Sequence, residues 1–568
     1  MTDPQNKVVD LAAQVEERLR QEAAELAAAE PKKDEAPPAT GGPDDPRFIM
    51  RCLANNERGD GILFTALQRD QYVYNKTNGL WYQWEGHHWS IDKLNRATTA
   101  VESVAVKYLD EAAKLRAEVD ALSSDMAAAE EKAENCRTAK DESGARKATA
   151  LAGQLAVQID RVNSKLKNLK KRVERLRSVR GAANCLTWAH CVEQPLAIVG
   201  DEIDKKPMLL ACKNGVIDLE TGRLYPGNPS DYLVRAIPVE YHGIDCVNQD
   251  WEKFQREIHG EENTLVDFVR RYFGYSITGL TTEQYLSTFI GEGANGKGTM
   301  FETLHEVLGE LAWSIDPEMI LEQKNAKSSA GPSPDIISLY GRRLVVASET
   351  EQHRRISGAK VKRLTGSDTL TGRAPHDKYE VNFTPTHTLA LVTNHAPKGL
   401  AADFALFRRL LYLEYPLRYV ADPALEARSD PQNAAIYRQR DPDLPRRLLA
   451  NQPGILAWLV RGCLEWQRDG LKPPDKLRAA AEAIRRNEDH LARFIEESCR
   501  RIDNDSRLLF KLFYGKFEEW FAENVDEEKR YKPTKKSIAD QLRRKGYQVE
   551  NTGGQTYVYG LDVEGLLA

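Results

Sequence analysis

The stretch GEGANGKGT at residues 291–299 has the residue types and spacing of a phosphate-binding loop. In such a loop, glycines let backbone N–H groups converge on phosphate oxygens, while a lysine supplies positive charge for the β- and γ-phosphates. Lys297 stands at the lysine position, and an apolar run at 286–290 precedes the loop. We therefore predict a strand, a loop and a helix from about Lys297 to Leu308 that bind ATP. The predicted nucleotide-binding residues are Gly291, Gly293, Ala294, Asn295, Gly296, Lys297, Gly298 and Thr299.

The loop departs from the usual pattern at the residue that holds magnesium. Gly298 follows the lysine where Ser or Thr is expected, and Thr299 comes one position later, about 100° further around a helix. Two arrangements remain open. Thr299 ligates Mg²⁺ through a distorted first turn, or water fills the position while carboxylates hold the hydrated ion, which is the arrangement we favour. The candidate metal ligands are Thr299 and Glu349.

Two later apolar runs end in polar residues that suit ATP hydrolysis. The run at 344–347 leads to Glu349 and Glu351, which would share one face of a strand because they are two residues apart. Carboxylates at this place hold magnesium through water and polarise the attacking water. The run in THTLALVTNHAP ends in Asn394, which would position that water. The alternative for the glutamates is that they only cap an exposed strand end.

An arginine pair completes the set of candidate catalytic residues. Arg408 and Arg409 lie in FALFRRLLYLEYP, on the far side of the predicted nucleotide site. An arginine there would stabilise charge on the γ-phosphate of a neighbouring subunit, which implies a ring. The alternative is that both are ordinary surface residues of an amphipathic segment.

The order and spacing of these motifs resemble the superfamily 3 helicases of small viruses, phages and plasmids. The closer resemblance is to the phage- and plasmid-type primase–helicase family that includes the poxvirus replication NTPase. It is carried by GEGANGKGT, LVVASETE, LTGSDTLTGR and LVTNHAP, and by KNGVIDLETGRLYP and GILAWLVRGCLEWQRDGL on either side. The resemblance covers roughly residues 48–96 and 181–568.

The resemblance implies a homo-hexameric ring that hydrolyses ATP with Mg²⁺ at subunit interfaces and moves single-stranded DNA of a fork through its pore. In such rings, a hairpin between the acid strand and the asparagine strand carries basic residues into the channel. Here TGRAPHDKYEVNF supplies Arg373, His376 and Lys378. Contact with phosphates in the pore needs positive charge but no base reading. A plain surface hairpin remains the alternative.

The last sixty residues indicate a second DNA contact. The segment PTKKSIADQLRRKGYQVENTGGQTYVYGL is typical of a helix followed by a strand–turn–strand wing that turns at Gly553-Gly554. Its charge suits a winged helix on duplex DNA, although such domains also dock proteins. The candidate DNA-binding residues are Lys535, Lys536, Arg543 and Arg544.

Residues 98–180 have a different sequence pattern, in which apolar residues recur at alternating spacings of four and three. The pattern occupies two consecutive segments separated by a polar turn near Ser143-Gly144, which predicts an antiparallel coiled-coil hairpin. The second segment is rich in basic residues, and either a solvated outer face or a contact with DNA or a partner explains them. These residues are Lys165, Lys167, Lys170, Lys171, Arg172, Arg175, Arg177 and Arg180.

Composition bounds the class of protein. The chain of 568 residues has a net charge of −5, eight cysteines without a C-x-x-C pair, and no apolar run near the roughly 18 residues of a membrane span. We expect a cytoplasmic protein with reduced thiols and no membrane partner. The expected fold is multidomain α/β, with an N-terminal helical and disordered segment (1–46), an α+β helicase-associated domain (47–97 and 181–262), the coiled-coil insertion (98–180), an AAA+-like P-loop ATPase core (263–420), a helical continuation of the motor (421–500) and a winged helix (501–568).

Three classes of function remain open from the sequence. The leading one is a replicative DNA helicase encoded by a phage or mobile element in a bacterial host. Fewer than fifty residues precede the resemblance, so we expect no primase domain in this chain, and a separate primase or replication initiator as a partner. The alternatives are a DNA-activated P-loop ATPase motor for defence or packaging that does not unwind DNA, and a non-enzymatic DNA-binding scaffold with a decayed site.

Overall fold

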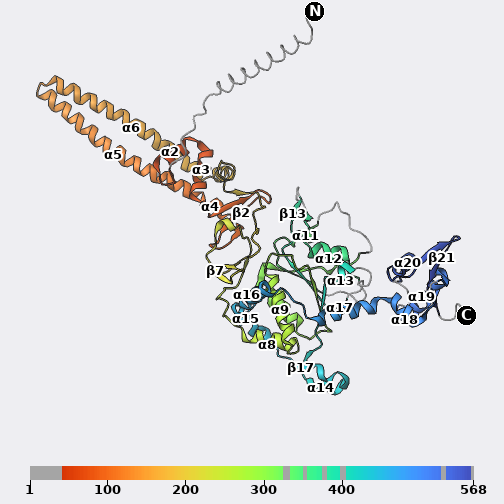
Figure 1. Cartoon of the computed structure of the whole chain (residues 1–568). Helices are drawn as coiled ribbons and strands as arrows, with labels where there is room; N and C mark the ends of the chain where they lie inside the picture. Colours follow the sequence, from red (N-terminus) through yellow and green to blue (C-terminus); the bar gives the residue numbers. More distant parts are fainter. Residues whose placement is uncertain are drawn as a thin grey trace, which may run out of the picture. The chain divides into compact units, whose positions relative to one another are not determined.

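The protein is a mixed α/β, multidomain chain (Figure 1). The computed structural model describes residues 41–323, 333–348, 355–373, 380–396, 404–503, 505–525 and 532–563. The chain divides into two compact units, of which the described parts are 41–83 with 91–200, and 84–90 with 201–563. The helix and linker predicted for residues 1–40 lie outside the described residues.

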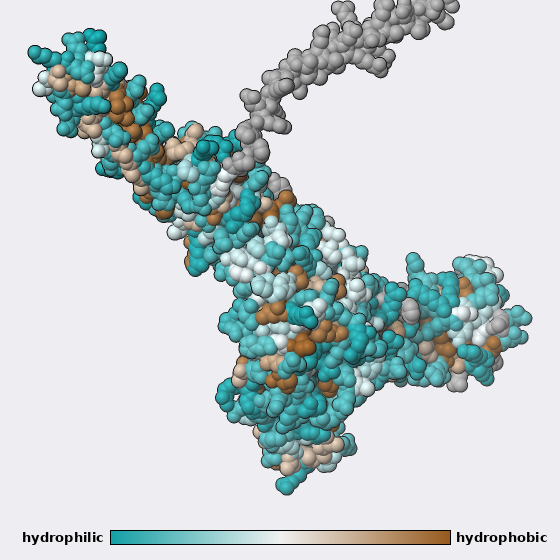
Figure 2. Space-filling view, turned by 60° about the vertical axis from the view of Figure 1, so that its left-hand side comes forward, coloured by the Kyte–Doolittle hydropathy of each residue, from teal (hydrophilic) through white to brown (hydrophobic). Residues whose placement is uncertain are grey.

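Two long helices dominate the first unit, α5 (Glu102–Thr138) and α6 (Glu142–Leu176), which lie side by side (Figure 1). Both predicted helices are confirmed. Residues of the predicted apolar pattern face inward, and Ala129 of α5 and Val162, Leu169 and Val173 of α6 are buried. The surface of the hairpin is mostly hydrophilic, with small patches of apolar side chains (Figure 2). The packing of the hairpin therefore depends on one narrow apolar seam.

The turn between α5 and α6 lies earlier than predicted. α5 ends at Thr138, and Asp141 caps α6 because its side chain accepts a hydrogen bond of 2.9 Å from the backbone N of Gly144. Ser143 and Gly144, near which the turn was predicted, are therefore in the first helical turn of α6. An aspartate N-cap outweighs a single glycine in setting where a helix begins.

Short elements surround the base of the hairpin and share its core. A predicted turn at Asn78-Gly79 is confirmed, since Asn75 pairs with Leu80 and Gly79 has a φ of +70°. The sheet has the order β3-β2-β1-β4. The elements are α2 (Pro46–Ala54), α3 (Asn56–Leu67), β1 (Tyr72–Asn75), β2 (Leu80–Trp84), β3 (Trp89–Ile91), α4 (Arg96–Ala100), α7 (Val179–Ala189) and β4 (Ala197–Ile198).

The second unit is built on a five-stranded parallel sheet of order β10-β11-β14-β9-β15. Helices cover both faces of such a sheet, which is why its strands are nearly continuous apolar runs. The predicted strand and helix on either side of the glycine-rich loop are confirmed with the predicted bounds. The elements are β9 (Leu286–Ile290), α10 (Lys297–Leu308), β10 (Ala312–Ile315), β11 (Leu344–Ser348), β14 (Thr388–Thr393) and β15 (Leu410–Glu414).

Helices α8 (Gln249–Ile258), α9 (Asn263–Ser276) and α16 (Gln452–Asp469) supply the largest buried side chains of this unit, including Trp251 and Trp458. The remaining helices are α11 (Pro334–Ile337), α12 (Gly358–Thr365), α13 (Phe404–Phe407), α14 (Pro423–Ser429), α15 (Leu444–Ala450) and α17 (Asp475–Glu488). The small sheets are formed by β5 (Leu209–Cys212), β6 (Gly215–Asp218), β7 (Arg223–Tyr225) and β8 (Ala236–Ile237), by β12 (Leu370–Gly372) with β13 (Val381–Phe383), and by β16 (Arg418–Val420) with β17 (Tyr437–Gln439).

The C-terminal segment has an aromatic core of its own around Phe494, Phe513 and Phe517. The predicted turn at Gly553-Gly554 is confirmed: both residues have positive φ and lie between the paired strands β20 and β21. The elements are α18 (His490–Ser498), β18 (Cys499–Arg501), β19 (Arg507–Leu509), α19 (Phe510–Asn524), α20 (Lys535–Arg544), β20 (Val549–Thr552), β21 (Gln555–Tyr559) and β22 (Leu561–Val563). Among the described residues, no helix combines the length and the apolar character needed to cross a membrane.

Candidate nucleotide-binding site

The predicted phosphate loop leaves the carboxyl end of β9 and leads directly into α10. Gly293, Ala294 and Gly296 all have positive φ, so the chain turns sharply and its N–H groups can point to one side. Gly296 is the N-cap of α10, and the first N–H groups of that helix have no partner within it. The loop therefore has the backbone shape and the helix dipole that bind an anion.

Two glycines of the loop are required by packing, whereas Gly298 is not. A Cβ atom on Gly291 would lie 2.2 Å from Nδ2 of Asn295, and one on Gly296 would lie 2.5 Å from Cγ2 of Ile258. On Gly298 the nearest atom would be Oε1 of Glu302 at 3.8 Å. The space beside Gly298 is thus open enough for a hydroxyl-bearing side chain or for water of a hydrated magnesium ion.

Lys297 begins α10 and is only 4% exposed. Its Nζ atom donates a hydrogen bond of 2.6 Å to the carbonyl oxygen of Gly291 and lies 5.9 Å from the centre of the Tyr415 ring. Burial lowers the pKa of Lys297 to about 8. Asn295 is also buried, and its Nδ2 donor lacks a hydrogen-bond partner among the described residues. A phosphate group in the loop would satisfy donors that the protein alone leaves unused.

Tyr415 lies against Lys297, and His259 contacts Tyr415. The sequence analysis identified neither residue as part of the site. The Tyr415 hydroxyl lies 2.7 Å from Nε2 of His259, and Nδ1 of His259 lies 2.7 Å from the carbonyl oxygen of Gln255. A carbonyl only accepts, so Nδ1 carries the proton and Nε2 accepts from the tyrosine hydroxyl. Burial lowers the pKa of His259 to about 4. Only the position of Tyr415, directly after β15, could have suggested this contact.

Asn394 follows β14, the strand that pairs with β9, and is exposed. The backbone N of Gly291 donates to the carbonyl oxygen of Thr393 at 3.3 Å, so Asn394 lies beside the start of the loop. β11 ends at Ser348, which is level with Val392 at the same edge of the sheet. The predicted acids Glu349 and Glu351 lie outside the described residues. Among the described residues, no group of three His, Cys, Asp or Glu side chains is placed to hold a metal ion.

Arg408 and Arg409 lie before β15, at the amino edge of the parallel sheet. The carbonyl oxygen of Arg409 accepts from the backbone N of Leu286, the first residue of β9. This edge and the phosphate loop lie at opposite ends of β9, and a five-residue strand is about 16 Å long. Arg409 is partly buried and donates to Oε1 of Gln284 at 2.6 Å, whereas Arg408 is exposed. The two arginines therefore do not join Lys297 within one chain.

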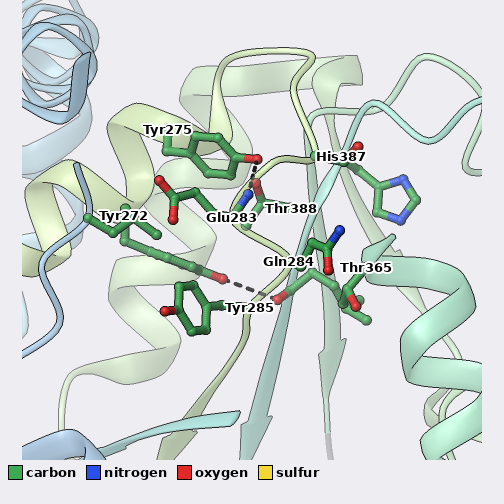
Figure 3. A pocket seen from close by; sticks show the side chains of 11 residues that line it. Tyr272, Tyr275, Glu283, Gln284, Tyr285, Thr365, His387 and Thr388 are labelled. Atoms are coloured by element: carbon green, nitrogen blue, oxygen red, sulfur yellow. Dashed lines mark hydrogen bonds between the residues drawn. The ribbon is translucent and has the colours of Figure 1, made fainter. Parts of the chain in front are cut away.

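A small pocket also lies at the amino edge of the sheet (Figure 3). His387 and Thr388, where β14 begins, line it together with Tyr275 and Glu283, and the hydroxyl of Tyr275 accepts from the backbone N of Glu283 at 3.2 Å. It has room for roughly one water molecule, so it is too small for a nucleotide.

The predicted DNA-binding residues are separate from the phosphate loop in sequence and in secondary structure. The hairpin of β12 and β13 is formed, and the half-buried Arg373 follows β12, while His376 and Lys378 lie outside the described residues. On α20, Lys535, Lys536 and Arg544 are exposed. Arg543 is engaged within the domain: its guanidinium donates to the carbonyl oxygen of Val549 and, at 2.9 Å, to Asp540.

Residues 61–260 match the protein family described as D5 N terminal like. A candidate helicase, L207/L206 of Acanthamoeba polyphaga mimivirus, is 25% identical over 333 residues, which are 57% of this chain and 34% of that protein. The candidate helicase 022R of Frog virus 3 is 25% identical over 393 residues, which are 57% of this chain and 40% of that protein. Primase D5 of Fowlpox virus is 24% identical over 236 residues, which are 38% of this chain and 28% of that protein.

The resemblance to the primase–helicase family that includes the poxvirus replication NTPase is confirmed by these relatives, which come from large DNA viruses. The chain spans less than half the length of each of the three. Among solved structures, the apo structure of the NrS-1 C-terminal region covers 64% of this chain and 85% of its own, with 12% identity and a TM-score of 0.34.

Proposed function

We infer that this chain, a relative of the D5-type primase–helicases, is an ATP-hydrolysing DNA helicase of the superfamily 3 type. One observation carries the proposal: Lys297 and a loop with positive φ values join β9 to α10, and Asn394 of the neighbouring strand lies beside that loop. This is the arrangement that P-loop ATPases use to bind and hydrolyse nucleotide.

Each predicted site residue has a proposed role. Backbone N–H groups of residues 291–299 bind the phosphates, and Lys297 donates to β- and γ-phosphate oxygens with the ammonium N–H groups that the Gly291 carbonyl does not use. Glu349 and Glu351 hold and polarise the attacking water, and Asn394 orients it. Thr299 and Glu349 are the residues that would hold Mg²⁺, directly or through water in the open space beside Gly298. When bound, Mg²⁺ neutralises charge on the β- and γ-phosphates.

The motor is an AAA+-like core that assembles as a homo-hexamer. The position of Arg408 at the edge of the sheet away from its own loop supports a role at the nucleotide of a neighbouring copy. The β12–β13 hairpin carries Arg373, His376 and Lys378 toward single-stranded DNA in the pore. The α5–α6 hairpin is an antiparallel coiled coil, and residues 501–563 form a winged helix whose exposed α20 cations contact the duplex of a fork. A separate primase or replication initiator is the expected partner.

The first test is steady-state ATP hydrolysis with Mg²⁺, with and without single-stranded DNA, for the unmodified chain and for Lys297→Ala. We expect turnover that DNA stimulates and that the variant loses. Absence of turnover in the unmodified chain, with nucleotide still bound, would support a non-enzymatic scaffold instead.

The second test is strand displacement on a fork. Replacing His376 and Lys378 by glutamine should abolish displacement and leave basal hydrolysis intact. Hydrolysis stimulated by DNA without any strand displacement by the unmodified chain would show a DNA-activated motor that is not a helicase.

A further inference from the structure

We propose that the α5–α6 hairpin binds the phosphodiester backbone of a nucleic acid in a groove between its two helices. The groove, called here the hairpin groove, has a volume of about 690 Å³. Its charged lining consists of Arg116 and Asp120 of α5 and of Lys167, Lys170, Lys171 and Glu174 of α6. The site is distinct from the phosphate loop, and the choice of nucleic acid as the ligand rests on the function proposed above.

The two helices differ sharply in charge. α6 contains nine basic and three acidic side chains, whereas α5 contains five basic and nine acidic ones. The overall charge of the chain is −5, so the basic character of α6 is local. A local excess of lysine and arginine on an otherwise acidic chain marks a place where an anion is attracted.

Ion pairs divide the basic side chains of this region into two groups. Arg172 is nearly buried, and its Nη1 lies 3.4 Å from Oδ2 of Asp60 on α3. Arg175 pairs with Glu57, and Arg177, just past the end of α6, pairs with Glu102. Arg172 and Arg175 thus join α6 to α3, and Arg177 joins the two ends of the hairpin, so the charge of all three is already compensated.

The lysines of the hairpin groove are not compensated in this way. Lys167, Lys170 and Lys171 are exposed, and within the described ranges none of them has an ion pair with a carboxylate. Arg116 across the groove is also exposed and likewise has no ion pair there. Solvation alone explains exposed lysines, but it does not explain why four cations that form no ion pair among the described residues line one groove.

The spacing suits a linear row of phosphates. Lys170 and Lys171 follow Lys167 by three and four residues, so the three lysines lie on neighbouring turns of α6 over about 6 Å of helix axis. Successive phosphates of one strand are about 3.4 Å apart along a duplex axis, so the row matches about two phosphate steps. The groove has four cations and two carboxylates, Asp120 and Glu174. This balance favours a single extended strand of phosphates that follows the lysines, and it disfavours a broad polyanionic surface that would also meet the carboxylates.

The test compares two triple variants of the full chain with the same change in charge. Lys167→Gln, Lys170→Gln and Lys171→Gln together remove the groove lysines. Lys132→Gln, Arg146→Gln and Lys147→Gln together remove three exposed cations near the turn of the hairpin, away from the groove. Fluorescence anisotropy of a labelled single strand and of a matched duplex is measured over a series of NaCl concentrations.

We expect the groove variant to bind at least one of the two probes about tenfold more weakly at low salt. The slope of log K against log[NaCl] should also become less steep by about two, because each lost phosphate contact removes about 0.7–0.9 from it. The control variant should bind nearly as the unmodified chain does. Equal losses in both variants, or none in the groove variant, would overturn the proposal. Basal ATP hydrolysis is measured alongside; its absence in the unmodified chain counts against the proposed function and leaves the binding comparison intact.

A second measurement uses only the unmodified chain, so its result does not depend on whether a variant folds. A strand that contains 5-bromouracil is cross-linked by ultraviolet light to the unmodified chain, and the cross-linked peptides are identified by mass spectrometry. Peptides that contain residues 163–174 support the hairpin groove. Cross-links confined to the β12–β13 hairpin or to α20 would overturn it. Circular dichroism at 222 nm should be the same for both triple variants, because lysine, arginine and glutamine have similar helix propensities.

Discussion

The Nζ atom of Lys297 donates a hydrogen bond of 2.6 Å to the carbonyl oxygen of Gly291, at the other end of the same loop. The lysine is 4% exposed, so this carbonyl replaces the water that an exposed ammonium group would bind. A lysine ammonium group has three N–H donors, so two remain for the phosphate oxygens of ATP while this bond is kept. The bond joins the two ends of the loop, which can therefore hold its shape before the nucleotide arrives.

Nucleotide affinity should fall as the pH rises above about 8. Burial lowers the pKa of Lys297 to about 8, and phosphates favour the charged form, so above this pH binding must also take up a proton. The decline approaches about tenfold per pH unit. A fluorescent ATP analogue titrated between pH 7 and 9.5 measures it, and calorimetry in buffers of different ionisation enthalpy detects the proton. Lys297→Arg should give a nearly flat profile, and a flat profile for the unmodified chain would contradict the prediction.

Alanine should be tolerated at one glycine of the loop and not at two others. Gly291→Ala places Cβ 2.2 Å from Asn295 Nδ2 and 2.7 Å from the Tyr415 carbonyl oxygen, and Gly296→Ala adds a clash with Ile258 at a φ of +87°. Both should weaken ATP binding at least tenfold. Gly298→Ala meets no atom closer than 3.8 Å and should bind normally. Equilibrium binding of the ATP analogue compares the three, and equal affinities would show that the loop rearranges freely.

Gly298→Ser should lower the magnesium concentration needed for half-maximal ATP hydrolysis by several-fold. The space at this position admits the side chain, and a hydroxyl after the lysine is a direct ligand in other phosphate loops. The measurement is a titration of MgCl₂ at fixed ATP. Thr299→Ala serves as the comparison: a small effect indicates that water fills the position, and a large increase in the magnesium requirement indicates that Thr299 is the ligand.

The burial of His259 should make the stability of the folded chain depend on pH. The pKa of His259 is about 4 in the folded chain and 6.5 for the free side chain, so the unfolded state binds more protons between these values. The resulting stabilisation, about 3 kcal/mol, is complete above pH 6.5 and is lost as the pH falls toward 4. Urea denaturation at pH 7 and pH 5 measures it. His259→Gln should reduce the difference between the two pH values; an unchanged difference would assign it to other groups.

Arg408 and Arg409 should differ in what they support. Arg409→Ala removes the hydrogen bond to Gln284 and should lower the free energy of unfolding by about 1–2 kcal/mol. Arg408→Ala should leave stability unchanged and reduce hydrolysis by at least a hundredfold if it reaches a neighbouring site. Mixing Arg408→Ala with Lys297→Ala subunits should restore part of the activity, because some interfaces then combine two intact residues. No restoration would argue against action between subunits.

Much of the motor could be predicted from the sequence because its signals are local. The apolar run of β9, the glycines of the loop and the start of α10 are adjacent in the chain, and the predicted bounds match the structure. The seam of the α5–α6 hairpin follows from helical periodicity alone. The turn between these helices was misplaced because the capping bond from Gly144 to Asp141, and not the glycine itself, sets where α6 begins.

Tertiary structure decided the features that join distant parts of the chain. His259 and Tyr415 are 156 residues apart, and neither has a motif, so only the packing of α8 against the end of β15 brings them together behind Lys297. The division of the α6 cations has the same origin. Arg172 and Asp60 are separated by 112 residues, and no local pattern shows that this arginine is paired while Lys170 is not. Sequence periodicity fixes which face of a helix is apolar; which charges remain uncompensated depends on the side chains that other segments place beside them.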